Sequence, residues 1–357
     1  MALPKTFPMQ VENGKTVDVP VVGFGTWAAG ANGWCKKSTL AALKAGYRHL
    51  DCAWIYGVDQ EVGEAIRESG IPRSEIFVTS KFWMNFAAPE NVELCLDKIL
   101  RNMGLDYIDL FLSHFPVAFK PTSAQGLAKT VSGSTATTEQ LAILEDPDTH
   151  SPAIDWEHCS SPIARKSDVW PLKNDFHPNL TKSIGQTGSF VPTWKAVQRL
   201  VPTGKVRAVG VSNFSVDDLQ DLAPHATDIP ISCNQIEVHP WLPNNEVVDY
   251  ARQHKILVTA YSPFAGQKED GQTLIKDETV QRIAVKKGMD VGQTLQSWAV
   301  QRGTVPLGKS QTEGRIRSNL NVRKLPDEDF EALNALAMPH AEGRTINFSS
   351  DWKLQLF

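Results

Sequence analysis

The sequence predicts an α/β protein with a single (β/α)8, or TIM, barrel over residues 1–357. Two observations predict this fold class. Eight short apolar runs alternate strictly with amphipathic helical segments, which is typical of parallel strands joined by helical crossovers. The polar residues of chemical interest also gather where the apolar runs end, and in a closed barrel those strand ends converge on one mouth. A mostly parallel open sheet is the alternative architecture.

Each element follows from its local pattern. Runs rich in Val, Ile, Leu and Tyr predict strands at 21–25, 47–51, 76–81, 107–113, 206–212, 232–237, 257–260 and 304–307. Amphipathic spacing predicts helices at 36–45, 60–69, 89–103, 191–200, 215–222, 244–254, 279–302 with a break at Gly288, and 313–320.

One long insertion interrupts this alternation after the fourth strand. Residues 120–188 are rich in Ser, Thr, Pro, Asp and His, and loops longer than about 15 residues are uncommon in compact domains. Trp156, Trp170 and Phe176 predict that part of the segment packs against the protein. Its place beside the mouth favours a lid, and a solvated surface excursion is an equal alternative.

Composition excludes several classes of protein. The net charge of −4, from 36 basic and 40 acidic residues, gives no basic face of the kind that nucleic acids require. The first residues lack the apolar core of a signal peptide, and no apolar stretch approaches the roughly 18–20 residues of a membrane span. The 5 cysteines are scattered without CxxC spacing, which indicates reduced thiols. We expect a cytoplasmic monomer or weak dimer without nucleic-acid, membrane or metal partners.

A P-loop pattern occurs in an unsuitable context. Residues 303–310, GTVPLGKS, match it in full, but a P-loop requires a strand before its first glycine, and here a helix is predicted. Lys309 and Ser310 still suit a phosphate, because they end a strand just before a helix.

A dinucleotide-binding pattern occurs in residues 23–28, GFGTWA, with Asp51 at about the distance of its ribose-binding acid. Trp27 is bulky where the backbone should approach a pyrophosphate, and residues 29–34 separate the glycines from the next helix. The sequence therefore disfavours a Rossmann fold.

Four residues with complementary chemistry lie at three successive strand ends: Asp51, Tyr56, Lys81 and His114. A phenol has an ordinary pKa of about 10, and a neighbouring Lys81 ammonium should lower the pKa of Tyr56 while Asp51 neutralises the lysine. His114 can donate a hydrogen bond to a carbonyl oxygen and fix its direction. Each residue alone has an ordinary structural interpretation, but all four together favour proton transfer to a bound carbonyl compound.

The blocks around these residues resemble the aldo-keto reductase family. They are GYRHLDCAWIY at 46–56, EVGEAI at 61–66, TSKFW at 79–83, LDYIDL at 105–110, SHFP at 113–116, GVSNF at 210–214, NQIEVHP at 234–240 and AYSP at 260–263. Their order is that of the family, and they cover nearly the whole chain apart from 120–188. The pattern is most similar to fungal members that act on glyceraldehyde, glycerol, pentoses or sugar acids.

The resemblance implies an oxidoreductase that transfers hydride from NADPH to a small aldehyde or ketone of the aldose, glyceraldehyde or uronate class. It implies a catalytic tetrad of Asp51, Tyr56, Lys81 and His114, with Tyr56 as the general acid. The implied NADPH contacts are Gly25, Thr26, Trp27, Asp51, Ser212, Asn213, Gln235, Tyr261, Ser262, Lys309, Ser310, Thr312, Arg315 and Asn319. The expected substrate contacts are Trp27, Tyr56, Trp83, His114 and Phe115, with Trp352 and Phe357 completing an aromatic pocket. The alternative is a regulatory barrel that binds NADPH without significant turnover.

Three positions depart from the family pattern. Relatives usually have proline where Gly308 stands, many have tryptophan where Phe115 stands, and Ala28 replaces a lysine that clamps the cofactor. The insertion at 120–188 is also longer than the loop of relatives, and we expect it to replace part of that clamp.

Overall fold

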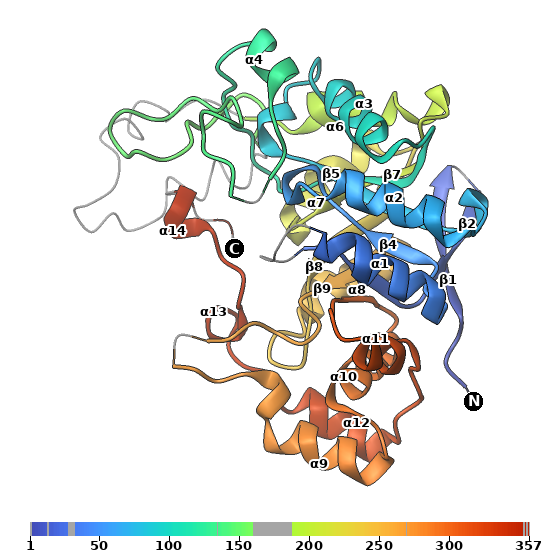
Figure 1. The fold of residues 1–357 in the computed structure, drawn as a ribbon. Coiled ribbons are helices and arrows are strands. Elements are labelled where there is room, and N and C mark those ends of the chain that lie inside the picture. The colour runs from blue at the N-terminus through green and yellow to red at the C-terminus, as the bar shows by residue number, and fades with distance from the viewer. Residues whose placement is uncertain are drawn as a thin grey trace.

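The computed structural model describes residues 2–12, 14–27, 33–133, 135–159, 188–268, 270–352, 354 and 356. Eight parallel strands close into a barrel in the order β10-β3-β4-β5-β6-β7-β8-β9, with helices outside it (Figure 1). The strands are β3 (Gly23–Gly25), β4 (His49–Asp51), β5 (Phe77–Phe82), β6 (Ile108–Ser113), β7 (Val206–Ser212), β8 (Cys233–Glu237), β9 (Leu257–Tyr261) and β10 (Val305–Gly308). The predicted barrel is confirmed, and strand ends differ from the predicted ones by one or two residues at most.

The helices follow the strands as expected from the amphipathic pattern. They are α1 (Trp34–Ala45), α2 (Asp59–Ser69), α3 (Val92–Met103), α6 (Val191–Gln198), α7 (Val216–Leu222), α8 (Asn245–Gln253), α9 (Glu278–Lys287), α10 (Val291–Gln301) and α11 (Glu313–Leu320). Gly288 ends α9 with a left-handed φ of 58°, and the Asp290 side chain then caps α10 by accepting from Gln293 N. The break predicted at Gly288 is therefore a true helix boundary.

Several elements were not predicted from the sequence. An antiparallel hairpin of β1 (Thr6–Glu12) and β2 (Lys15–Pro20) precedes the barrel. Its buried side chains, such as Met9 and Val19, pack with Leu110, Ala208 and Val305 of the barrel interior. The hairpin therefore closes the amino-terminal end of the barrel, and the carboxyl ends of the strands are left to form the site (Figure 1).

The carboxyl-terminal part adds three further helices, α12 (Asp327–Asn334), α13 (His340–Gly343) and α14 (Ser349–Trp352). Figure 1 places α13 and α14 at the end of the molecule that lies opposite the hairpin. This carboxyl-terminal segment therefore lies at the mouth of the barrel.

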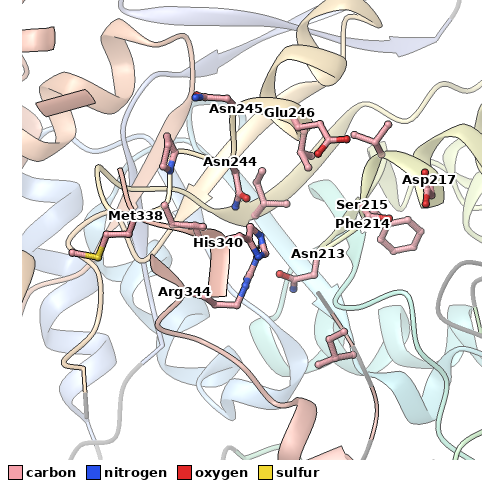
Figure 2. Close-up of a pocket in the computed structure, with 16 residues that line it drawn as sticks. Asn213, Phe214, Ser215, Asp217, Asn244, Asn245, Glu246, Met338, His340 and Arg344 are labelled. Atoms are coloured by element: carbon pink, nitrogen blue, oxygen red, sulfur yellow. Dashed lines mark hydrogen bonds between the residues drawn. The ribbon is translucent and has the colours of Figure 1, made fainter. Parts of the chain in front are cut away.

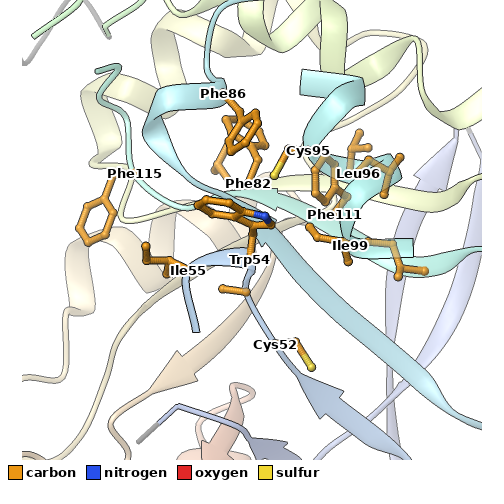
Figure 3. Packing of buried hydrophobic residues seen from close by; sticks show 14 of the residues in the cluster. Cys52, Trp54, Ile55, Phe82, Phe86, Cys95, Leu96, Ile99, Phe111 and Phe115 are labelled. Carbon is orange, nitrogen blue, oxygen red and sulfur yellow. The ribbon is translucent and has the colours of Figure 1, made fainter. Parts of the chain in front are cut away.

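A dense aromatic and aliphatic core supports the loop after β4. Trp54 is 1% exposed and meets Phe86 edge to face, with ring centroids 4.9 Å apart. Phe82, Phe111 and Ile99 belong to the same buried cluster, so β5, β6 and α3 all contribute to it (Figure 3). Burying a tryptophan removes a large apolar area from water. This packing fixes the short turn η1 (Trp54–Tyr56), at whose end Tyr56 stands.

The described part of the insertion packs on the barrel. It contains α4 (Ala124–Lys129), and its Leu127, Leu141 and Ile143 join the main core. Two barrel side chains hold it in place: Asn85 Nδ2 donates to Leu141 O at 2.6 Å, and Lys98 Nζ donates to Ala128 O at 2.7 Å. Trp156 also packs against the core, as expected, whereas Trp170 and Phe176 lie outside the described residues.

The closed barrel rules out the open Rossmann sheet. The P-loop pattern is also misplaced, because Gly303 follows α10 and the strand β10 lies inside the motif. Among the described residues, no helix combines the length and the apolar character that crossing a bilayer requires.

Candidate active site

A buried ion pair lies at the centre of the barrel mouth. Lys81 of β5 donates from Nζ to Asp51 Oδ2 at 2.8 Å and to the backbone oxygen of Cys52 at 2.7 Å. The ammonium also lies 5.2 Å from the centroid of the Tyr56 ring. His114 follows β6, and its ring meets the Tyr56 ring edge to face at 5.8 Å. The structure thus brings the four predicted tetrad residues together.

Asp51 connects several strands at once. Its second carboxylate oxygen, Oδ1, accepts from Gln235 Nε2 of β8 at 2.8 Å, on the opposite side of the barrel. Its backbone oxygen accepts from Thr26 N at 3.1 Å and from Thr26 Oγ1 at 2.8 Å, while Gly25 pairs with Asp51 in the parallel register of β3 and β4. Asp51 on β4 is therefore bonded to β5 and β8 through its carboxylate and to the end of β3 through its backbone.

The pKa of Tyr56 departs from the prediction. Burial raises it well above 10, and the nearby Asp51 carboxylate adds to the rise. The expected lowering by Lys81 is wrong, because Asp51 lies within hydrogen-bond distance of the ammonium and neutralises its effect, so desolvation of the phenolate dominates. The phenol of Tyr56 accordingly keeps its proton at neutral pH.

His114 has the opposite shift. Burial lowers its pKa well below 6.5, and the positive charge of Lys81 lowers it further. Its ring is therefore neutral, and a neutral imidazole donates through only one nitrogen. Its Nδ1 is buried and has no hydrogen-bond partner among the described residues. The histidine can offer a single directed hydrogen bond to a bound group.

The residues predicted to hold the nicotinamide form one hydrogen-bonded chain. Ser212 Oγ donates to Gln235 O at 2.8 Å, Asn213 Nδ2 donates to His114 O at 2.9 Å, and Tyr261 OH donates to Asn213 Oδ1 at 2.8 Å. Asn213 has a left-handed φ of 64°, which asparagine tolerates better than most residues. Ser262, the next predicted contact, follows Tyr261 with a φ of 48°.

The residues predicted to hold the adenosine end lie between β10 and α11. Lys309 Nζ sits 4.9 Å from the centroid of the Trp34 ring, and burial lowers the pKa of this lysine. Ser310 Oγ accepts from Thr312 N at 3.1 Å. Arg315 is exposed on α11, whereas Asn319 is 4% exposed. The structure thus presents two cations and two hydroxyls around the start of one helix.

Gly308 stands where a side chain does not fit. A Cβ atom there would lie 2.6 Å from Gln296 Oε1 and 3.0 Å from Phe264 Cζ. Gln296 and Phe264 therefore occupy the space that a proline ring at this position would need.

The predicted aromatic pocket is present in part. Trp83 contacts His114 at 5.1 Å, and Phe115 contacts Trp352 at 4.9 Å between ring centroids. Phe348 also stacks on Trp352, a contact that the sequence analysis missed. Trp27 is 52% exposed, and Phe357 and the clamp position Ala28 lie outside the described residues.

A cavity of about 480 Å³ adjoins Asn213. It lies between the loops after β7 and β8 and the carboxyl-terminal segment, whose His340 and Arg344 line it (Figure 2). Arg344 also approaches Glu237, whose side chain is fully buried, at 3.5 Å. Glu237 and its contacts were not predicted from the sequence, although its place two residues after Gln235 puts both side chains on the same face of β8.

Comparison with known proteins identifies the family. The family model described as the aldo/keto reductase family matches residues 21–338. The chain belongs to the aldo/keto reductase family.

Two relatives and one solved structure illustrate the similarity. The chain is 36% identical over 332 residues to the aldehyde reductase YPR1 of Saccharomyces cerevisiae, covering 92% of this chain and 91% of that protein. It is 35% identical over 351 residues to the D/L-glyceraldehyde reductase of Hypocrea jecorina, covering 95% and 91%. The fold matches the crystal structure of a Bombyx mori aldo-keto reductase in complex with NADP, with a TM-score of 0.72, 28% identity and coverage of 98% and 97%.

The buried pair of Lys81 and Asp51 allows a test of stability. Asp51→Asn should reduce the free energy of unfolding by about 3–5 kcal/mol, because the buried Lys81 ammonium loses its countercharge. Adding Lys81→Met should restore part of the loss. Urea unfolding followed by circular dichroism measures both.

The exposed pair of Arg252 and Asp249 supplies the control, since Asp249→Asn should change the same quantity by less than about 1 kcal/mol. If Asp51→Asn has as small an effect as Asp249→Asn, the buried pair does not stabilise the mouth.

Proposed function

We propose that this protein is an NADPH-dependent reductase that converts a small aldehyde or ketone of the aldose, glyceraldehyde or uronate class to the alcohol. The observation that carries the proposal is the grouping of the Tyr56 ring with the buried pair of Lys81 and Asp51 and with the ring of His114. The relatives named as an aldehyde reductase and a glyceraldehyde reductase support the substrate class.

The roles of the tetrad follow from its protonation states. Reduction of a carbonyl group adds a hydride to carbon and a proton to oxygen, and bound NADPH supplies the hydride. Tyr56 donates the proton as general acid, since its raised pKa keeps the phenol protonated until charge develops on the oxygen. His114 donates a hydrogen bond that orients this oxygen. Lys81 would attract the phenolate that remains, although less than an unpaired ammonium would, because Asp51 binds it and holds it in position.

The chemistry of the donor set fits a nicotinamide. A side-chain amide oxygen accepts two hydrogen bonds, so Asn213 Oδ1, which takes one from Tyr261, can take a second from a carboxamide. Gln235 and Ser212 would bind the same group, and Tyr261 would stack on the ring. Gly25, Thr26, Trp27 and Ser262 would line the path to the adenosine end.

The fit at the adenosine end explains the choice of cofactor. Lys309, Ser310 and Thr312 would contact the 2′-phosphate together with Arg315, since a guanidinium binds phosphate oxygens bidentately. Asn319 would contact the adenine. A doubly charged phosphate suits this pair of cations, and NADH carries no group that would use them.

The setting of the protein is part of the same proposal. All 5 cysteines are buried and free, which supports a cytoplasmic location. Small-molecule carbonyl compounds are the proposed partners. A monomer or weak dimer stays a prediction, as does the lid role of residues 120–188, of which 134 and 160–187 lie outside the described residues.

The general acid can be removed without changing the shape of the site. Tyr56→Phe should lower kcat for reduction by about 10²–10⁴-fold, because the proton donor is lost while the ring remains. Loss of nicotinamide absorbance with glyceraldehyde, xylose and galacturonate measures this. If the wild type binds NADPH but oxidises none with any aldehyde or ketone, the regulatory alternative replaces the enzyme.

The pKa directions predict the pH dependence of reduction. The active forms are a protonated Tyr56, whose pKa lies well above 10, and a neutral His114, whose pKa lies well below 6.5. Both forms persist at neutral pH, so kcat should be flat from about pH 7 to about pH 9 and should fall only when the phenol ionises. A midpoint near pH 7 in that profile would contradict the assignment.

Cofactor preference can be tested on α11. Arg315→Ala should raise the Kd for NADPH by about 10–100-fold, since a charge-assisted bond to phosphate is lost. The Kd for NADH should change little. Arg317→Ala on the same helix is the matched control, and equal effects of the two variants on both cofactors would disprove a 2′-phosphate contact by Arg315.

A further inference from the structure

Glu237 forms a buried junction at the end of β8. Its carboxylate accepts from His239 Nε2 at 3.0 Å, from Thr345 N at 3.0 Å and from Ile346 N at 3.2 Å. Thr345 Oγ1 donates to the same group. A buried carboxylate requires such partners, because burying it without them is strongly unfavourable. The Glu237 carboxylate thus holds the carboxyl-terminal segment to the barrel, and the segment in turn supplies hydrogen bonds that this buried charge needs.

Thr345 also binds the loop after β9. Its Oγ1 also accepts from Gly266 N at 3.0 Å. The two residues are in close contact, since a Cβ atom on Gly266 would lie 3.2 Å from Thr345 Cβ. One hydroxyl therefore joins the end of β8, the carboxyl-terminal segment and the 262–266 loop.

The 262–266 loop has a conformation that needs outside support. Ser262 and Ala265 both have left-handed φ angles, of 48° and 54°, which are unfavourable for residues other than glycine. Such backbone persists where surrounding contacts fix it. The bond from Gly266 to Thr345 is one of these contacts, and the loop begins directly after Tyr261 on the proposed nicotinamide side.

The same segment builds the aromatic wall on the substrate side. Phe348 follows Thr345 closely in the chain and stacks on Trp352 with ring centroids 5.1 Å apart. Trp352 in turn contacts Phe115 at 4.9 Å and Trp83 at 6.0 Å. A displacement of Thr345 would therefore move both the 262–266 loop and the aromatic wall.

We propose that Glu237, Thr345 and Gly266 form a latch, by which we mean a hydrogen-bonded connection through which Thr345 positions both the 262–266 loop and the aromatic wall. Thr345 is a positioning residue, since it acts through Gly266 and Phe348. The inference rests on the proposed function, because NADPH and a carbonyl compound are the ligands whose sites the latch aligns.

The experiment removes the hydroxyl and keeps the shape. Thr345→Val should raise the Kd for NADPH, measured by quenching of tryptophan fluorescence, by about 10-fold. It should also raise KM for glyceraldehyde and leave kcat within about threefold, because the tetrad is untouched. Thr345→Ser, which keeps the hydroxyl, should stay within about twofold of the wild type.

A matched control lies away from the mouth. Thr203 Oγ1 also donates one bond, to Leu200 O, and accepts one, from Lys205 N, but it stands just before the amino-terminal end of β7. Thr203→Val should leave the Kd and KM unchanged. If Thr345→Val lowers only the melting temperature, or if Thr345→Ser is as impaired as Thr345→Val, the latch is overturned.

Hydrogen exchange tests the latch without any ligand. The amide of Gly266 should exchange about 10-fold faster in Thr345→Val than in the wild type, and unchanged exchange overturns the latch. Failure of the wild type to bind or oxidise NADPH would instead overturn the proposed function, and the exchange rates would still decide whether the latch exists.

Discussion

The ion pair between Lys81 and Asp51 is the constraint on which the rest of the mouth depends. Two buried charges are tolerated only when their hydrogen-bond partners are complete, because desolvation costs several kcal/mol for each ion. Those partners come from different strands: Lys81 of β5 and Gln235 of β8 bind the Asp51 carboxylate, and Thr26 after β3 binds the Asp51 backbone oxygen. A strand displaced by one residue would turn these side chains away. The same register of the parallel strands therefore closes the barrel and assembles the site.

This pairing also determines the protonation of its neighbours. Because Asp51 neutralises the ammonium, Lys81 cannot keep Tyr56 ionised against the effect of burial, and the phenol stays protonated. The same burial keeps His114 neutral. The mouth thus presents uncharged donors beside a compensated pair. Such a site gains most from a substrate oxygen when negative charge develops on it, which is the condition for stabilising a transition state rather than a ground state.

The sequence predicted what depends on short-range pattern. Strand ends carry their own signal, so all eight barrel strands and the residues at their carboxyl ends, Asp51 and His114 among them, were found without the structure. The hairpin at 6–20 was missed because its buried side chains pack against the amino-terminal end of the barrel, and this contact can be seen only once the barrel has formed. The direction of the Tyr56 shift was missed for a related reason, since burial at the mouth is set by packing of η1 on α3, β5 and β6. The contact of Glu237 with Thr345 joins distant parts of the chain, and no periodic pattern in the sequence predicts it.

The departures of this chain from its family acquire a physical meaning in the same way. Gly308 is tolerated because Gln296 and Phe264 fill the space that a side chain would need. Phe115 is smaller than the tryptophan of many relatives, yet its ring is enclosed by Phe348 and Trp352 from the carboxyl-terminal segment. The proposed substrate wall is therefore built from two parts of the chain, one at the end of β6 and one that hydrogen-bonds to the carboxylate of Glu237. The proposed substrates are small and hydroxylated and bury little apolar area, so we expect discrimination among them to depend on how firmly that second part is held.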